Sequence, residues 1–167
     1  MPPLFRLRRA RDTNAEAIAR VHVASWQAAY RDIIPSTTIE GFDLPGCIIS
    51  WQRQLDSGVT VWVVTEDDLI VGFAEVRGSE VPVLYIHPGW WRLGLGSRLL
   101  RRALAEIAKS GHRQAVIWVL VDNTKARQFY GWHGGLARDR RTIRFGGSEL
   151  AEVCYLFDMS AEAVDHQ

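Results

Sequence analysis

The residues with the clearest chemical potential are two glycines, Gly94 and Gly96, in the stretch HPGWWRLGLGSRLL that runs from His87 to Leu100. An apolar run, VPVLYI, precedes this stretch and predicts a strand, and an amphipathic segment follows it and predicts a helix. A glycine turn between a strand and a helix favours an anion, because free backbone N–H groups converge there at the positive end of the helix dipole. The spacing therefore predicts a phosphate-binding turn, with a plain strand–helix turn as the alternative.

Two well-known glycine-rich phosphate sites do not match this turn. A Walker P-loop requires a lysine directly after its last glycine, and WRLGLGSRL has none. A dinucleotide-binding fingerprint requires a third glycine where Leu99 stands, and several further βα units for which too little chain remains. A third design has to account for the turn.

A second motif, NTKARQFY, lies about 30 residues further along and contains Asn123, Ala126, Phe129 and Tyr130. It resembles the N-x-x-A-x-x-F-Y segment of the GNAT superfamily of N-acetyltransferases. The first stretch is similar to the acyl-CoA signature of the same family, which reads Gln or Arg, two residues, Gly, one residue, then Gly or Ala. Here Trp91 takes the first place, ahead of Gly94 and Gly96, so one side-chain contact changes while the backbone donors remain.

The resemblance implies acetyl-CoA as cosubstrate, no metal, and direct attack by an amine on the thioester. The implied cofactor-binding residues lie on two segments: Tyr85, Ile86, His87, Trp91, Arg92, Leu93, Gly94, Leu95, Gly96, Ser97, Arg98, Asn123, Ala126, Phe129 and Tyr130. The implied catalytic groups are a backbone N–H near Ile86, which would support the oxyanion, and the Tyr130 hydroxyl, which would protonate the leaving thiolate. The alternatives are a packed aromatic for Tyr130 and a plain helix cap for Asn123.

The base that accepts the proton of the amine is less clearly indicated. Glu75, in GFAEVR, is our candidate because related enzymes often place a carboxylate on this strand, and a solvated charge on a strand face is the alternative. His22 lies on the apolar stripe of the first helix, which favours a satisfied core histidine. Trp26 and Tyr30, one helical turn apart, are candidates for an aromatic wall of the acceptor pocket, with core packing as the alternative.

The order of the predicted elements is β-α-α-β-β-β-α-β-α-β-β. Strands are expected at 5–9, 59–66, 69–77, 81–88, 114–121, 136–145 and 149–157, and helices from Thr13, at 48–55, from Ser97 and at 123–132. The segment PSTTIEGFDLPG is expected to be a loop. The pattern predicts a mixed α/β fold with one central, mostly antiparallel sheet of about seven strands and about four helices, as the resemblance also implies.

Composition limits the class of protein. With 167 residues and no linker or repeat, one domain over 1–167 is expected. A formal net charge of +1 gives no overall attraction to nucleic acid. No apolar run reaches the roughly 18 residues of a membrane span, and no signal peptide is expected. Cys47 and Cys154 lack metal-ligand spacing and are expected to be reduced, which favours a cytoplasmic protein.

The function expected from these motifs is transfer of an acetyl group from acetyl-CoA to a primary amine of a small molecule. Two alternatives stay open: a protein or peptide as acceptor, and a CoA-binding sensor without turnover. The sequence does not identify the acceptor amine, the acyl-chain length or the oligomeric state, for which a homodimer is one option. Neither does it assign a role to the Trp90–Trp91 pair.

Overall fold

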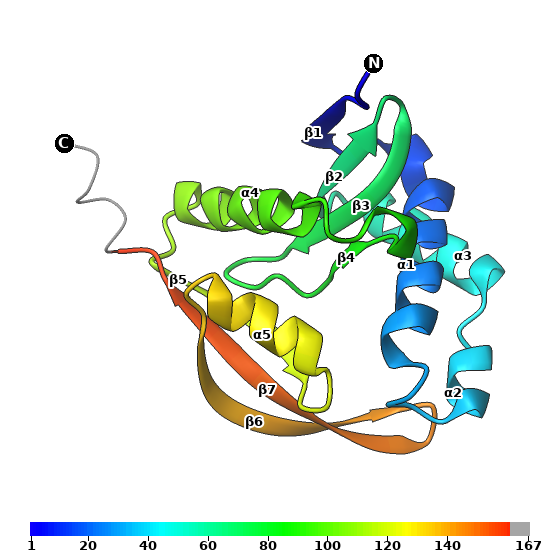
Figure 1. Ribbon diagram of the computed structural model, residues 1–167, viewed down its shortest axis with the longest axis vertical. Helices are drawn as coiled ribbons and strands as arrows, with labels where there is room; N and C mark the ends of the chain where they lie inside the picture. The colour runs from blue at the N-terminus through cyan, green and yellow to red at the C-terminus, as the bar shows by residue number, and fades with distance from the viewer. Residues whose placement is uncertain (161–167) are drawn as a thin grey trace.

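The structure, a computed structural model, describes residues 1–160 (Figure 1). Within this part of the chain the elements are β1 (Phe5–Arg9), α1 (Ala15–Tyr30), α2 (Ser36–Glu40), α3 (Leu44–Asp56), β2 (Thr60–Glu66), β3 (Leu69–Val76), β4 (Leu84–Ile86), α4 (Leu95–Lys109), β5 (Gln114–Leu120), α5 (Thr124–Trp132), β6 (Leu136–Phe145) and β7 (Ser148–Asp158). The predicted α/β order is confirmed, with α2 added in a segment expected to be a loop.

The strands form two sheets where the sequence predicted one. A four-stranded antiparallel sheet has the order β1-β2-β3-β4, and a three-stranded antiparallel sheet has the order β5-β7-β6. A single parallel bridge between Glu80 and Val116 joins them just ahead of β4. Beyond that bridge β4 and β5 diverge, so that the two sheets form a V that opens toward α5 (Figure 1).

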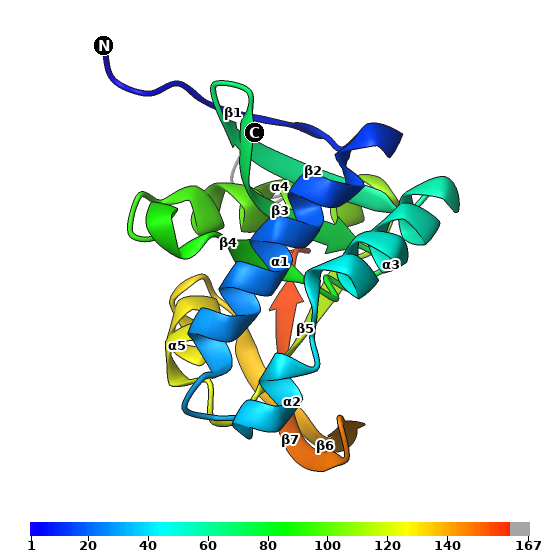
Figure 2. The same ribbon diagram turned by 90° about the vertical axis from the view of Figure 1, so that its right-hand side faces the viewer.

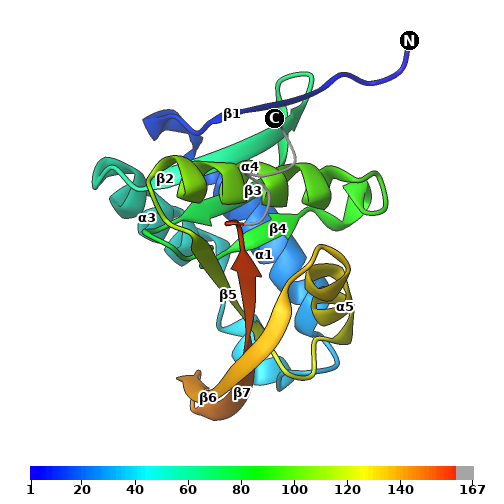
Figure 3. The same ribbon diagram turned by 90° about the vertical axis from the view of Figure 1, so that its left-hand side faces the viewer.

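Helices cover both faces of the four-stranded sheet. Because successive side chains of a strand point to opposite faces, Val61 and Val63 of β2 pack against α1 and α3, while Val64 packs with α4. Figure 2 shows α1 and α3 on one side of this sheet, and Figure 3 shows α4 on the other. The two faces therefore hold separate apolar cores.

The three-stranded sheet is covered by α5 on one face and meets the end of α1 on the other. Tyr155 and Phe157 of β7 pack in the same core as Tyr130 of α5. Leu120 of β5 packs instead with Trp26 and Tyr30 of α1. Both faces of β5 are apolar although it is an edge strand of its sheet, because it is covered on two faces and open only toward β4.

Local signals explain where the helices begin. Asp43 caps α3, its side chain accepting a 2.7 Å hydrogen bond from the Gly46 N–H, so the helix starts four residues ahead of the predicted start. The helix predicted from Thr13 begins at Ala15, because a 3-10 turn at Asp12–Asn14 precedes it. In this turn the Asn14 side chain accepts a hydrogen bond from the Arg11 N–H.

Among residues 1–160, no helix combines the length and the apolar character that crossing a membrane requires.

Candidate functional site

The turn before α4 has the backbone geometry of an anion site. Gly94, at φ +75°, is in the left-handed region that favours glycine, and Arg92 is also left-handed, at φ +65°. The first hydrogen bond of the helix runs from the Arg98 N–H to the Gly94 carbonyl (3.2 Å), so the N–H groups just ahead of Arg98 have no partner within the helix. Backbone N–H groups converge in such a turn and offer a concave site for a phosphate.

Gly96 brings three predicted site residues together. A Cβ atom at Gly96 would lie 3.4 Å from Cζ of Phe129 and 3.8 Å from Cγ1 of Ile86. The absence of a side chain at this position therefore lets the first turn of α4 approach α5 and β4 closely. The two sequence motifs meet at this contact.

The backbone of β4 presents the N–H groups of Leu84 and Ile86 to the side away from β3, where the gap between the two sheets lies. The His87 N–H donates to Val71 (2.8 Å), and the Glu75 N–H donates to Val83 (2.9 Å). Since such pairs alternate along an antiparallel ladder, residues 83, 85 and 87 bond to β3, and Ile86 faces away from it. The N–H groups predicted to bind cofactor at Tyr85 and His87 thus belong to the sheet, whereas the predicted N–H of Ile86 points toward β5.

The carbonyl group of Ile86 is already paired. It accepts hydrogen bonds from the Ser25 hydroxyl (3.1 Å) and from the indole N–H of Trp91 (2.7 Å). The Trp91 ring also lies 6.0 Å from the Lys125 ammonium of α5, and the residue is 41 % exposed. Trp91, one residue of the Trp90–Trp91 pair, therefore lies at the entrance of the gap. Trp90 donates its indole N–H to Glu66 (3.0 Å).

Tyr130 lies on the face of α5 that packs against the sheet. It is 7 % exposed, with its ring centroid 5.3 Å from Phe129 and 6.1 Å from Tyr155. Burial and, less strongly, the neighbouring Tyr30 raise the pKa of Tyr130 well above its usual value, so the phenol keeps its proton. Among residues 1–160 its hydroxyl has no hydrogen-bond partner, yet it is not one of the fully enclosed unpaired polar atoms. The hydroxyl therefore keeps some exposed area.

The predicted acceptor residues lie beside the gap. Trp26 and Tyr30 are both 8 % exposed and pack together, with ring centroids 5.2 Å apart. The Tyr30 hydroxyl is 3.1 Å from the hydroxyl of Tyr85, and burial raises the pKa of both phenols. Asn123 caps α5, the alternative to its predicted cofactor contact, and accepts a hydrogen bond from the Ala126 N–H (3.2 Å).

The structure does not bring Glu75 into this group. Glu75 is 2 % exposed, and its carboxylate accepts hydrogen bonds from the Arg77 guanidinium at 2.6 and 3.0 Å. Arg77 also reaches Gln54 of α3 (3.4 Å), which places the pair on the face that α3 covers, away from the gap. The candidate base is thus corrected to a structural ion-pair partner.

Two other predicted residues have positions unlike those expected. The Arg98 guanidinium is directed to the Phe5 carbonyl of β1, at 3.4 and 3.5 Å, and not to the open side of the turn. The His87 ring accepts a hydrogen bond from the Gly89 N–H (3.1 Å), which assigns it to the short turn after β4. Arg92, Leu93 and Gly94 are exposed, and Leu95 is buried in the core.

Sequence reasoning missed two side chains at this site. His133, at the end of α5, lies with Nε2 2.9 Å from the Ser97 hydroxyl in the first turn of α4. Ser25 binds the Ile86 carbonyl from α1. Both contacts join residues more than 30 positions apart in the chain, and no motif includes them.

His22 has the structural role that the sequence favoured. Its Nδ1 accepts a 3.0 Å hydrogen bond from the Trp51 indole, and its ring stacks on Tyr85 with centroids 5.3 Å apart. Burial lowers the pKa of His22 to about 4. The ring is therefore neutral at physiological pH.

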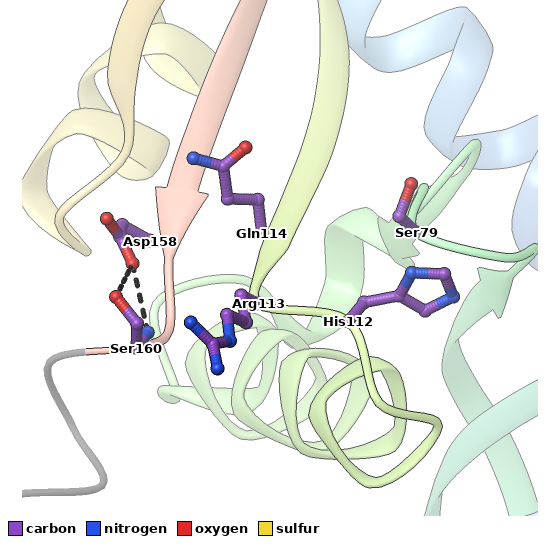
Figure 4. Close-up of a pocket in the computed structure, with 6 residues that line it drawn as sticks. All are labelled: Ser79, His112, Arg113, Gln114, Asp158 and Ser160. Carbon is purple, nitrogen blue, oxygen red and sulfur yellow. Dashed lines mark hydrogen bonds between the residues drawn. The ribbon is translucent and has the colours of Figure 1, made fainter.

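Two hollows differ in their relation to the gap. A cavity of about 320 Å³ adjoins the Trp26–Tyr30 cluster and is lined by Thr37, Thr38, Gly41, Phe42, Phe145 and Gly146. A larger, open hollow of about 500 Å³ lies near the C-terminal end of α4. It is lined by Ser79, His112, Arg113, Gln114, Asp158 and Ser160 (Figure 4). The larger hollow contains none of the predicted site residues. Within residues 1–160 no group of His, Cys, Asp and Glu side chains is arranged to hold a metal ion.

Comparison with known families connects these features. A family model described as an acetyltransferase (GNAT) domain matches residues 57–134, a range that includes Ile86, the Gly94 turn and Tyr130. This match and the N-acetyltransferase relatives together indicate a GNAT-superfamily acetyltransferase. The part of the chain that matches the GNAT domain thus coincides with the gap, the turn and the helix described above.

One sequence relative of this GNAT chain is the uncharacterized N-acetyltransferase YuaI of Bacillus subtilis. The two are 26 % identical over 126 residues, which cover 70 % of this chain and 72 % of YuaI. The relationship therefore extends well beyond the two motifs.

Solved structures confirm the GNAT fold. A GCN5-related N-acetyltransferase from Rhodopseudomonas palustris superposes with a TM-score of 0.82 and 22 % identity, covering 95 % of this chain and 98 % of that one. YncA from Salmonella typhimurium, a putative acetyltransferase whose structure contains acetyl-CoA, superposes with a TM-score of 0.68 and 17 % identity, covering 93 % and 94 %. The two-sheet arrangement of this chain is thus that of the GNAT fold.

Proposed function

We propose that this protein transfers an acetyl group from acetyl-CoA to a primary amine of a small molecule. The observation that carries the proposal is the Ile86 N–H, which faces the gap between the sheets without a strand partner on that side. The anion-binding turn before α4 and the Tyr130 hydroxyl border the same gap. Family membership and the acetyl-CoA present in the structure of YncA support the choice of cosubstrate.

The cosubstrate would be held by backbone groups for most of its length. Its pyrophosphate would bind the free N–H groups at the start of α4, with the exposed Arg92 adding charge. Its pantetheine arm would lie along the open edge of β4, as an added strand does. The arm would enter past Trp91, whose indole now covers the Ile86 carbonyl.

The chemistry would proceed through a tetrahedral intermediate. The amine nitrogen forms a bond to the thioester carbon, and the Ile86 N–H donates to the oxygen that becomes negative. The carbon–sulfur bond then breaks, and the Tyr130 phenol gives its proton to the departing thiolate. The proton that the amine nitrogen loses passes to solvent, from which the phenol is reprotonated. The products are an N-acetylated amine and the free thiol of CoA.

A small acceptor is favoured by the space beside the gap. The cavity of about 320 Å³ adjoins the Trp26–Tyr30 cluster and has the aromatic rings of Phe42 and Phe145 in its wall. Its volume matches a small-molecule site, whereas a protein acceptor calls for an extended groove. Cys47 and Cys154 are free and buried, which supports the cytoplasmic location proposed for the enzyme.

The test is a direct assay of both products. Purified protein is incubated with acetyl-CoA and, separately, with polyamines, amino acids, aromatic alkylamines and a lysine-containing peptide. Free CoA thiol and the acetylated product, detected by mass, should appear with a small amine. Product formed only with the peptide would favour a protein acceptor. If none of the acceptors yields product, a CoA-binding module without turnover would be favoured.

A further inference from the structure

One carboxylate lies on the face of the three-stranded sheet that meets α1. Val153, Tyr155 and Phe157 of β7 point toward α5, where they share a core with Tyr130. Side chains alternate along a strand, so Leu150 and Glu152 point to the opposite face. Leu150 packs there against the cluster of Trp26 and Tyr30. Glu152 therefore shares its face of the sheet with the predicted acceptor residues.

The strand register places Glu152 next to the gap. Glu152 is directly opposite Leu120, the last residue of β5, and Leu120 packs in the cluster that contains Tyr30. Its charge acts on two hydroxyl groups at the gap, since it contributes, after burial and closer neighbours, to the raised pKa values of Tyr30 and Tyr85. Thus Glu152 lies close to the Tyr30–Tyr85 hydroxyl pair.

The Glu152 side chain is held in place by a stacked partner. Its Oε2 atom accepts a 2.7 Å hydrogen bond from Nε of Arg141, its neighbour on β6. The Arg141 guanidinium lies 4.1 Å from the centroid of the Trp118 ring on β5. The three side chains come from three adjacent strands, so the carboxylate has a fixed direction.

The second carboxylate oxygen of Glu152 is available to a ligand. The side chain is only 13 % exposed, and within residues 1–160 Oε1 has no hydrogen-bond partner. A charged oxygen that is largely removed from water is stabilised by a cationic partner. An alkylamine in its protonated form, which is the main form near neutral pH, supplies such a partner. The bound ammonium gives one proton to solvent before its nitrogen attacks the thioester.

We propose that Glu152 selects the acceptor: its Oε1 binds the ammonium group of an alkylamine beside the Tyr30–Tyr85 pair. This inference rests on the proposed function and gives the acceptor a chemical class, a cationic alkylamine. Amines that are neutral near pH 7, such as anilines and hydrazides, gain nothing from this contact. Glu152 is therefore a specificity-determining residue of the same reaction.

The test compares two glutamate-to-glutamine variants on the same strand, β7. Glu152→Gln removes the proposed contact, and Glu149→Gln removes the same charge from an exposed residue that is paired with Arg144 at 3.6 Å, on the opposite face of β7. For an alkylamine, Glu152→Gln should raise KM about 10- to 100-fold, the range for loss of a hydrogen bond to a charged group, with kcat within a few-fold. For a hydrazide acceptor KM should not change. Glu149→Gln should match the wild type with both acceptors.

Several outcomes would overturn this assignment. Equal KM values for the two variants, or equal rises in KM for alkylamine and hydrazide, would assign Glu152 a structural role as the partner of Arg141. If Glu152→Gln unfolds, Glu152→Asp keeps the charge and should raise KM for the alkylamine more than for the hydrazide. A wild type that binds acetyl-CoA and acetylates amines, with no effect at Glu152, refutes this inference alone. A wild type that forms no acetylated product refutes the proposed function as well.

Discussion

Tyr130 is the residue on which the proposed chemistry depends most directly. Its phenol keeps its proton because burial raises its pKa, and its hydroxyl is not fully enclosed. Tyr130→Phe removes the proton donor while leaving the ring that packs on Phe129. We expect kcat to fall about 100-fold, the lower range for general acid catalysis, with KM for acetyl-CoA within a few-fold, measured by the release of CoA thiol.

Tyr155→Phe is the matched control for Tyr130→Phe. Tyr155 lies in the same core, but its hydroxyl accepts a hydrogen bond from Arg127 (3.2 Å) and is not part of the gap. Its loss should lower the free energy of unfolding by about 1 kcal/mol and leave kcat near the wild-type value. A Tyr130→Phe enzyme with the full wild-type rate would exclude the acid role.

His22 gives the protein a predictable response to acid. Its pKa is about 4 in the folded state, against an ordinary value of 6.5. Above pH 6.5 the ring is neutral in both states, so its full contribution to stability is present. Between pH 6.5 and 4 the unfolded chain binds a proton that the folded His22 does not, and the free energy of unfolding should fall by up to about 3 kcal/mol.

Urea unfolding across pH 4 to 7 measures this response. In His22→Gln the side chain does not titrate but still offers an acceptor to the Trp51 indole, so this part of the pH dependence should be absent. An unchanged acid slope in the variant would show that other groups cause it.

At several residues the sequence indicated the local role, because the role depends on residue type and on spacing along the chain. The glycine turn at Gly94 and the satisfied His22 were indicated by residue type and spacing, and the cap at Asn123 was one of two interpretations. Glu75 was misjudged because a sequence does not show which face of a sheet a helix covers, and its partner, Arg77, lies just past the end of β3. Glu152 carries no motif at all.

At the scale of elements, the turn before α4 is the part that can be tested separately from the fold. Gly94 and Gly111 flank α4 and have φ values of +75° and +95°. Alanine at either position should destabilise the protein by about 1 kcal/mol, because a side chain disfavours the left-handed region. Only Gly94→Ala should also weaken acetyl-CoA binding, by about tenfold or more, measured by calorimetry.

Gly111→Ala controls for the backbone strain in this comparison. It alters the end of α4 that is remote from the proposed pyrophosphate site, and its Cβ would meet no neighbour within 4 Å. Equal affinities of the two variants for acetyl-CoA would mean that the turn at Gly94 does not hold the phosphate groups.

The order of the elements could be predicted from sequence, but their division into two sheets could not. Hydrophobic periodicity located the strands to within a few residues. The strand predicted at 81–88 is reduced to Leu84–Ile86 because its first residues bridge toward β5 before the strands separate. Pairing between distant strands depends on backbone geometry that periodicity does not contain. The gap that forms the site is a consequence of that separation.

At the scale of the whole molecule, two motifs far apart in the chain meet because of how the two sheets separate. The separation of β4 from β5 leaves the Ile86 N–H facing a gap, while α4 and α5 close around it through Gly96 and Phe129. The motifs are thus the two sides of one site. Their contact could be predicted from the family resemblance, whereas the acceptor side, built from α1, α2 and the β6–β7 turn, could not.

The central claim is that this gap binds acetyl-CoA, and thermal unfolding with and without the compound tests it most directly. At 100 times its dissociation constant a ligand adds about 2.7 kcal/mol of stability, which should raise the Tm by about 5 to 10 °C for a domain of this size. Acetyl-CoA and CoA should both produce this shift, and ATP and NADH at equal concentration should not. No shift with acetyl-CoA, or an equal shift with NADH, would contradict the account.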